Sequence, residues 1–116
     1  MSAQEFAFKP SDRLLMENVL NEVLNGFRVD NFSSVIGMDE SELNNVLSGL
    51  HDLPNDAQLR LSLPQTLAFR NALREALREL GTEEFHSRTG FDFESAKTFL
   101  DELNTLIQPS KSIRDG

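Results

Sequence analysis

The chain has 116 residues, no cysteine and a formal net charge of −8. This length is usual for one domain, and the lack of cysteine excludes disulfides, zinc-thiolate sites and thiol nucleophiles. The negative charge argues against nonspecific electrostatic binding of nucleic acid, because such binding needs clustered Lys and Arg. We therefore expect a single globular domain over residues 1–108, followed by a frayed tail over residues 109–116.

The start of the chain and its overall hydropathy favour a cytoplasmic protein. Residues 1–10 contain neither a basic stretch nor a long apolar run, so we expect no secretory signal. No later segment approaches the ~20 apolar residues that a membrane span needs, so no membrane association is expected. With 39% hydrophobic and 26% charged residues, the composition is that of a folded globular protein.

The first predicted element is a short strand. Residues Phe6-Ala7-Phe8 alternate between apolar and small side chains, which is typical of a half-buried strand. A similar alternation, Leu59-Arg60-Leu61, occurs 53 positions later. Because strands this short are not stable alone, we predict that the two pair as a two-stranded antiparallel ribbon.

Three helical segments are predicted after the first strand. The first helix begins near Pro10 and ends at Gly26, a residue suited to a left-handed cap. A short helical turn anchored by Phe32 follows and ends at Gly37. The third helix begins after Asp39, which has Glu42 three residues on, the spacing of a capping box.

A second set of the same elements is predicted after the linker of residues 54–56. The first helix of this set begins after Ser62, which has capping-box spacing to Gln65, and ends at Gly81. A short turn follows and ends at Gly90, and Asp92 caps the last helix. The apolar positions of these helices recur with helical period. They include Leu14, Leu15, Val19, Leu20, Val23, Leu43, Val46, Leu47 and Leu50 in the first set, and Phe69, Ala72, Leu73, Ala76, Leu77, Ala96, Phe99, Leu100 and Leu103 in the second.

The two sets align as an internal duplication. Residues 14–53 match residues 67–106 without a gap, and twelve of the forty aligned pairs are identical, against about three expected from composition. The pattern predicts a mostly α-helical fold made of two tandem repeats, about 5–53 and 58–106, each a short strand, a helix, a short helix and a helix. Each repeat would be marginal alone, so we expect the two to share one core.

Each repeat also resembles a tri-helical, helix-turn-helix scaffold, although it resembles no particular family. The spacing of Phe32, Gly37 and Leu43 suits a short helix, a tight turn and a second helix. A DNA recognition helix should start with Arg, Lys, Asn or Gln, whereas this one starts Asp39-Glu40-Ser41-Glu42. Acids there stabilise a helix start and repel DNA. Nucleic acid binding is therefore disfavoured, and a helix-turn-helix DNA-binding regulator is the alternative.

Catalytic and metal-binding motifs are weak. Residues Glu83-Glu84-Phe85-His86 have the Glu-x-x-His spacing of a di-metal site, but the aligned segment of residues 30–33 has no histidine. His86 is therefore interpreted as a surface residue. His51 beside Asp52 is a similarly weak metal or acid-base candidate. No phosphate loop, dinucleotide motif or nucleophile elbow is present, so we expect no enzyme activity, no cofactor and no bound metal.

The most distinctive surface feature is an arginine row. Arg70, Arg74 and Arg78 are spaced four apart, so they lie on one stripe of a helix. Such a stripe is either a solvated face or a surface that receives acidic groups of a partner. Residues 1–53 carry nine acids and three bases, a net charge of −6, whereas residues 54–116 carry ten acids and eight bases, a net charge of −2.

This asymmetry favours a non-catalytic protein-interaction or accessory module that binds a protein partner or a second copy of itself. An acidic decoy or inhibitor that binds a basic partner is a further alternative. The candidate interaction surface comprises Arg70, Arg74, Arg78, Asp39, Glu40, Glu42, Asp52 and His86.

Overall fold

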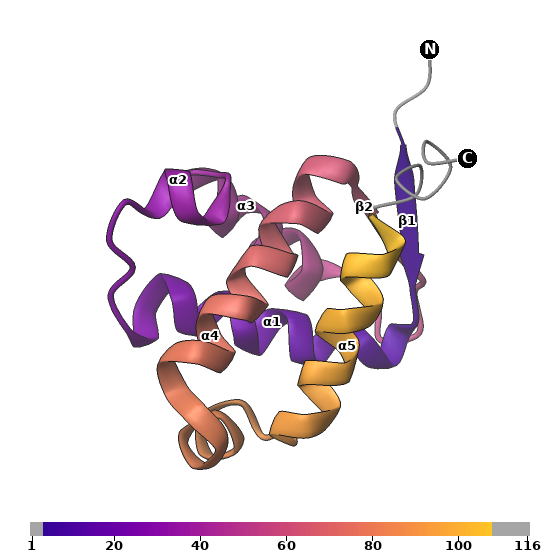
Figure 1. Ribbon diagram of the computed structural model, residues 1–116. Coiled ribbons are helices and arrows are strands. Elements are labelled where there is room, and N and C mark those ends of the chain that lie inside the picture. The colour runs from indigo at the N-terminus through magenta and orange to yellow at the C-terminus, as the bar shows by residue number, and fades with distance from the viewer. Residues whose placement is uncertain (1–3, 108–116) are drawn as a thin grey trace, which may run out of the picture.

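The computed structural model describes residues 4–107, so the predicted tail of residues 109–116 lies outside the described part. The fold is mostly helical with one small two-stranded sheet, as predicted. The elements are β1 (Glu5–Phe8), η1 (Pro10–Asp12), α1 (Arg13–Asn21), η2 (Glu22–Gly26), α2 (Phe32–Ile36), α3 (Glu40–Asp52), β2 (Leu59–Ser62), α4 (Leu63–Thr89) and α5 (Phe93–Leu106). Figure 1 shows α4 and α5 crossing one face, α1 behind them, and the ribbon at one side.

The predicted two-stranded ribbon is confirmed. Strands β1 and β2 pair antiparallel, with Phe6 opposite Leu61 and Phe8 opposite Leu59. These four side chains are buried, while Ala7 and Arg60 face outward. Ala7 lies opposite Arg60, its own counterpart 53 positions on. The register therefore centres on a pair of equivalent residues.

The predicted helix starts are also confirmed. At α3 the Asp39 carboxylate accepts from the Glu42 N–H at 2.8 Å, and the Glu42 side chain accepts from the Asp39 N–H at 3.2 Å. Ser62 and Gln65 form the same reciprocal pair at α4, with distances of 3.2 and 2.9 Å. These bonds satisfy amide donors that have no partner inside the helix.

Three of the four predicted glycine turns have positive φ. Gly37 and Gly90 end their helices at φ of 95° and 80°. Gly81, at φ 73° and ψ −177°, kinks α4 so that its last part turns away from the first. The helical segment ends at Gly26 as predicted, but the predicted left-handed conformation is wrong, because Gly26 has no positive φ. A β-carbon there would displace the Glu22 carboxylate, which Arg88 binds.

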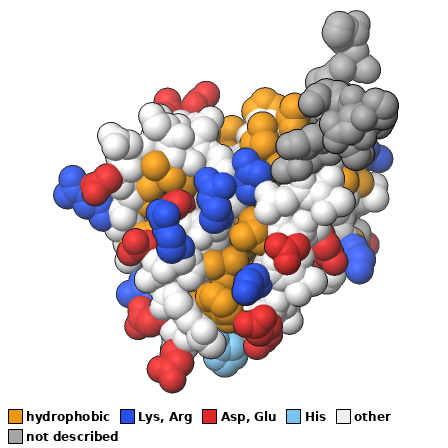
Figure 2. Space-filling view, viewed as in Figure 1, with side chains coloured by type: hydrophobic (Ala, Val, Ile, Leu, Met, Phe, Trp, Pro, Cys, Tyr) orange, Lys and Arg blue, Asp and Glu red, His pale blue; other side chains and the backbone are white. Residues whose placement is uncertain are grey.

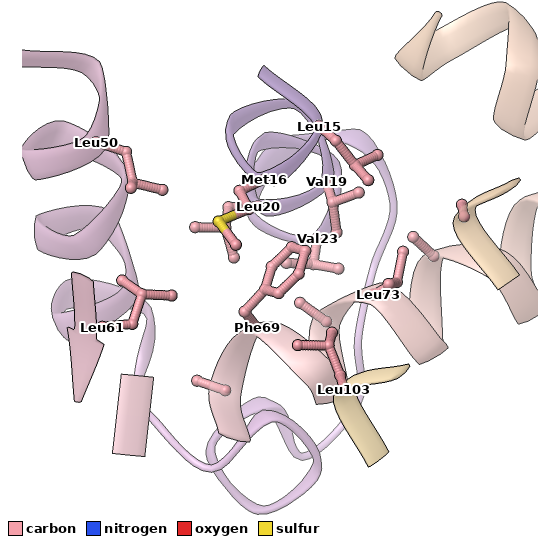
Figure 3. Packing of buried hydrophobic residues seen from close by; sticks show 14 of the residues in the cluster. Leu15, Met16, Val19, Leu20, Val23, Leu50, Leu61, Phe69, Leu73 and Leu103 are labelled. Carbon is pink, nitrogen blue, oxygen red and sulfur yellow. The ribbon is translucent and has the colours of Figure 1, made fainter. Parts of the chain in front are cut away.

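One hydrophobic core contains residues of both halves. Figure 3 shows Met16 and Val19 of α1 facing Phe69 and Leu73 of α4, and the two helices pack against each other. Phe69 also packs against Phe99 of α5, with ring centroids 6.0 Å apart. Every buried residue in the range 5–53 has a buried counterpart 53 positions later. The two halves therefore bury the same positions in a shared interior.

A pair of hydrogen bonds crosses between the halves. The Asn18 amide donates to the Thr89 carbonyl at 2.9 Å, and the Asn71 amide donates to the Ile36 carbonyl at 2.8 Å. Asn18 aligns with Asn71, and Ile36 aligns with Thr89. Each half therefore binds the end of the other half's short helix through the same side chain. This reciprocity is the pattern of a two-fold interface between equivalent units.

We expect Asn18→Ala and Asn71→Ala to lower the free energy of unfolding by similar amounts, about 1 to 2 kcal/mol each, because each leaves a partly buried carbonyl without its donor. Urea denaturation measures both values. Asn25→Ala serves as the control, because the exposed Asn25 amide donates only to the Asn21 side chain. A large loss for one variant and none for the other would contradict equivalent roles.

Candidate interaction surface

The arginine row (Arg70, Arg74 and Arg78) lies on α4, and its first member is held in place. Arg70 is half-buried, and its guanidinium donates to Asn71 Oδ1 at 2.8 Å and to Asn104 Oδ1 at 2.9 Å. The second bond ties α4 to α5. Burial, and then the positive charge of Arg74, lower the pKa of Arg70. Arg70 and Arg74 are therefore close enough to repel each other.

The second member of the row, Arg74, is the one available for binding. Arg74 is exposed and forms no hydrogen bond or ion pair with any residue from 4 to 107. Arg78 is also exposed, but it pairs with Glu75, whose side chain is 8% exposed. Figure 2 shows Lys and Arg side chains near the middle of this face, beside exposed hydrophobic side chains. The row thus presents a free guanidinium between two that have partners.

The structure does not bring the four candidate acids together. Asp39 and Glu42 bind each other at the start of α3, and Glu40 is exposed beside them. Asp52 is the last residue of α3, about 18 Å away at the helical rise per residue. The first three acids therefore form one group that stabilises a helix start, and Asp52 belongs to another part of the surface.

Asp52 lines a hollow between α1 and α3. This α1–α3 hollow has a volume of about 420 Å³ and is lined by Glu17, Asn18, Asn21, Leu47, Ser48, His51 and Asp52. Glu17 Oε1 lies 3.3 Å from His51 Nδ1, and the Glu17 side chain is only 15% exposed. Glu17 was not among the residues predicted for the surface. The arrangement groups carboxylates, amides and an imidazole at one polar depression.

The two halves make an equivalent contact here with different chemistry. Glu17 aligns with Arg70, and His51 aligns with Asn104. The Glu17–His51 contact in the first half therefore corresponds to the Arg70–Asn104 bond in the second. The alignment alone indicates that these two positions are paired, because the residues at both positions differ between the halves. The same backbone frame holds a carboxylate in one half and a guanidinium in the other.

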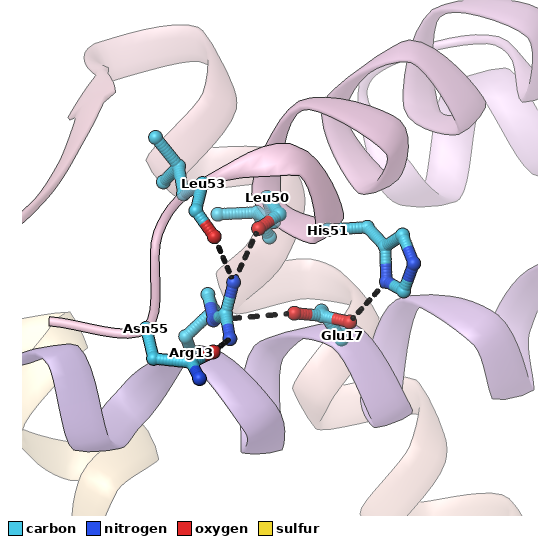
Figure 4. A network of polar contacts seen from close by, with 6 residues as sticks. All are labelled: Arg13, Glu17, Leu50, His51, Leu53 and Asn55. Atoms are coloured by element: carbon cyan, nitrogen blue, oxygen red, sulfur yellow. Dashed lines mark hydrogen bonds and ion pairs between the residues drawn. The ribbon is translucent and has the colours of Figure 1, made fainter. Parts of the chain in front are cut away.

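A network around Arg13 fixes α3 to α1 (Figure 4). Arg13 Nη1 donates to the carbonyls of Leu50 and Leu53 at 3.2 and 2.6 Å, and Nη2 donates to Asn55 Oδ1 at 2.7 Å. Its Nε lies 3.5 Å from Glu17 Oε2. Arg13 thus binds carbonyls at the end of α3, of which the Leu50 carbonyl also accepts the Leu53 N–H at 3.3 Å. Glu17 belongs both to this network and to the lining of the α1–α3 hollow.

A second arginine contact joins the two halves at the far end of α1. Arg88 Nη1 donates to Glu22 Oε1 at 3.0 Å and to the Gly26 carbonyl at 3.1 Å. The hydrogen bond to Glu22 and the charge of Glu22 raise the pKa of Arg88. The carbonyl of Gly26, the last residue of the π-helical turn η2, therefore accepts a hydrogen bond from a side chain of α4. This contact joins the two halves, and the Arg88 guanidinium already has partners within the chain.

The remaining candidate, His86, is exposed and makes no side-chain hydrogen bond or ion pair within residues 4–107. In that part of the chain, no three His, Asp or Glu side chains are grouped so as to hold a metal ion. None of its helices combines the length and the apolar character needed to cross a membrane. Comparisons with protein-family models, with curated proteins and with solved structures gave no match.

Proposed function

We propose that the protein is a non-catalytic interaction module of the cytoplasm, and that its arginine row binds an acidic protein surface. The observation that carries this proposal is Arg74, an exposed guanidinium without a partner in residues 4–107, on a chain with net charge −8. Arginine suits such a role because its planar group binds a carboxylate through two hydrogen bonds. Arg70 and Arg78, held by their own contacts, flank it on the same stripe.

The arrangement of polar groups supports a binding role. The carboxylates in the least exposed positions, Glu17, Glu22 and Glu75, each pair with an arginine of the same chain. Of these pairs, Arg88–Glu22 links α4 to η2, whereas Arg13–Glu17 and Arg78–Glu75 each lie within one helix. Arg74, Asp52 and His86 are exposed, and their side chains form no hydrogen bond or ion pair within residues 4–107. Exposed groups of this kind serve recognition by charge.

We further propose that the fold arose by internal duplication. The register of Ala7 opposite Arg60, the reciprocal bonds of Asn18 and Asn71, and the matched buried positions support this origin. Under this proposal the residues common to both halves maintain the architecture. The interaction surface then lies where the halves differ, and the arginine row is one such place, because its aligned residues are Glu17, Asn21 and Asn25.

We expect Arg74→Glu to abolish retention of the natural partner while leaving the fold intact, because Arg74 is exposed and forms no hydrogen bond or ion pair within residues 4–107. The measurement is capture from extracts of the source cells on immobilised protein, followed by mass spectrometry. Arg28→Glu makes the same change in charge at a side chain that is 90% exposed on another part of the surface. Equal retention by wild type, Arg74→Glu and Arg28→Glu would contradict the proposal.

The alternative of a DNA-binding regulator has a separate test. Exposed acids at Asp39, Glu40 and Glu42 occupy the start of α3, where a recognition helix would approach the bases. We therefore expect no binding when generic duplex DNA is titrated at low salt. Binding whose affinity falls steeply with added salt would favour the regulator instead.

A further inference from the structure

Two parts of the surface occupy aligned positions but carry opposite charge. The α1–α3 hollow contains Glu17, Asn21 and Asp52. Their aligned residues on α4 and α5 are Arg70, Arg74 and Thr105. Where the first half has carboxylates around a depression, the second half has guanidinium groups. One molecule therefore carries both members of a complementary pair.

The arginine side of this pair lacks a counter-charge. No carboxylate of residues 4–107 forms an ion pair with Arg70 or Arg74. The repulsion between these two groups contributes to the lowered pKa of Arg70. A carboxylate from another molecule would relieve this repulsion and would accept two parallel hydrogen bonds from Arg74.

The acidic surface also contains a carboxylate without an ion-pair partner. Asp52 is exposed, lines the hollow, and forms no ion pair within the described residues 4–107. A guanidinium that entered the hollow would meet the Asp52 carboxylate, and Asn21 lines the same hollow. The second half already contains a guanidinium bound at the aligned place. There Arg70 donates to the side-chain oxygen of Asn104, which aligns with His51 of the hollow.

We propose that the arginine row of one molecule docks onto the α1–α3 hollow of a second copy, with Arg74 bound to Asp52. This inference rests on the proposed function, since it names the acidic surface that the row binds. The contact joins two different surfaces, so it leaves one of each free and extends head to tail into a ring or a filament. Repulsion between two chains of net charge −8 is screened beyond about 8 Å at physiological ionic strength, so local charges govern the contact.

The test uses sedimentation velocity on the full chain at concentrations up to about 1 mM, where weak complexes are populated. Wild type is expected to gain mass with concentration, whereas Arg74→Glu and Asp52→Lys are each expected to stay monomeric. Their equimolar mixture is expected to associate, because the intact arginine row of Asp52→Lys meets the intact α1–α3 hollow of Arg74→Glu. Arg28→Glu and Glu40→Lys make the same charge changes elsewhere and should associate like wild type.

A monomeric wild type at every concentration overturns the inference, as does association of Arg74→Glu alone at the wild-type level. Loss of association in Glu40→Lys but not in Asp52→Lys also overturns it, because the acceptor would then be the start of α3. Circular dichroism confirms that each variant is folded. If wild type stays monomeric while Arg74→Glu still loses a captured partner, this inference is wrong and the proposed function stands.

Discussion

Replacing Arg13 with alanine is expected to lower the free energy of unfolding by about 3 kcal/mol, because several charge-assisted hydrogen bonds are lost together. The guanidinium binds the carbonyls of Leu50 and Leu53 and also lies beside Glu17. Without it, the Leu53 carbonyl loses the Arg13 donor, and the Glu17 carboxylate, which is 15% exposed, loses its ion pair with Arg13. Chemical denaturation followed by circular dichroism measures the change.

Two further variants separate this network from a general effect of charge. Arg13→Lys keeps the charge but cannot reach both carbonyls with one planar group, so we expect an intermediate loss. Arg28→Ala removes a pair whose side chains are 90% and 80% exposed, so we expect a change within about 0.5 kcal/mol. An Arg13→Ala variant as stable as Arg28→Ala would show that the network contributes nothing.

Gly81→Ala is expected to destabilise the protein by about 2 kcal/mol, because Gly81 has a backbone conformation that other residues rarely adopt. Its φ of 73° and ψ of −177° turn the last part of α4. That turn carries Phe85 into the interior, where its ring packs edge-on against Phe93 at 6.1 Å. A β-carbon at residue 81 would touch nothing within 4 Å, so the loss isolates backbone strain.

Gly49→Ala is the matched control for this prediction. Gly49 lies inside α3 with ordinary helical geometry, and a β-carbon there would also meet nothing within 4 Å. Alanine should therefore stabilise the protein by about 0.5 to 1 kcal/mol, since it favours the helix more than glycine. Thermal unfolding of both variants gives the comparison. If both variants changed the melting temperature in the same direction, the assignment of backbone strain to Gly81 would be contradicted.

Local signals in the sequence account for most of the fold. The capping boxes at Asp39 and Ser62, the turns at Gly37 and Gly90, and the paired strands all depend on residues close in sequence or on a repeated pattern. Capping needs a side-chain oxygen three residues before its donor, and a strand needs alternation, so both leave a readable trace.

Contacts between distant residues could not be predicted in this way. Gly26 looks like a left-handed cap, but its environment is decided by Glu22 and by Arg88, which is more than sixty positions away. Arg13 looks like an ordinary base in a first helical turn, although it binds the end of α3. Arg70 belongs to a charged stripe by spacing, yet α5 buries part of it. Such contacts depend on how the helices pack.

The candidate surface was therefore predicted only in outline. Spacing placed the arginine row on one helical stripe, and the structure distinguishes its members, because Arg70 and Arg78 have partners and Arg74 has none within residues 4–107. Composition grouped Asp52 with Asp39 and Glu42, although α3 separates them. Charge counts locate such residues along the chain, whereas burial and hydrogen bonding decide which remain available to a partner.

Amide chemical-shift mapping of the isotope-labelled chain tests most directly that the arginine row is the binding surface. The spectra are recorded on dilution of the chain alone and on addition of any protein that the wild type retains. We predict shifts on residues 70–78 of α4 with either partner, joined by shifts at residues of the α1–α3 hollow when the chain associates with itself. Shifts confined to other elements, with residues 70–78 unchanged throughout, would contradict the proposed function.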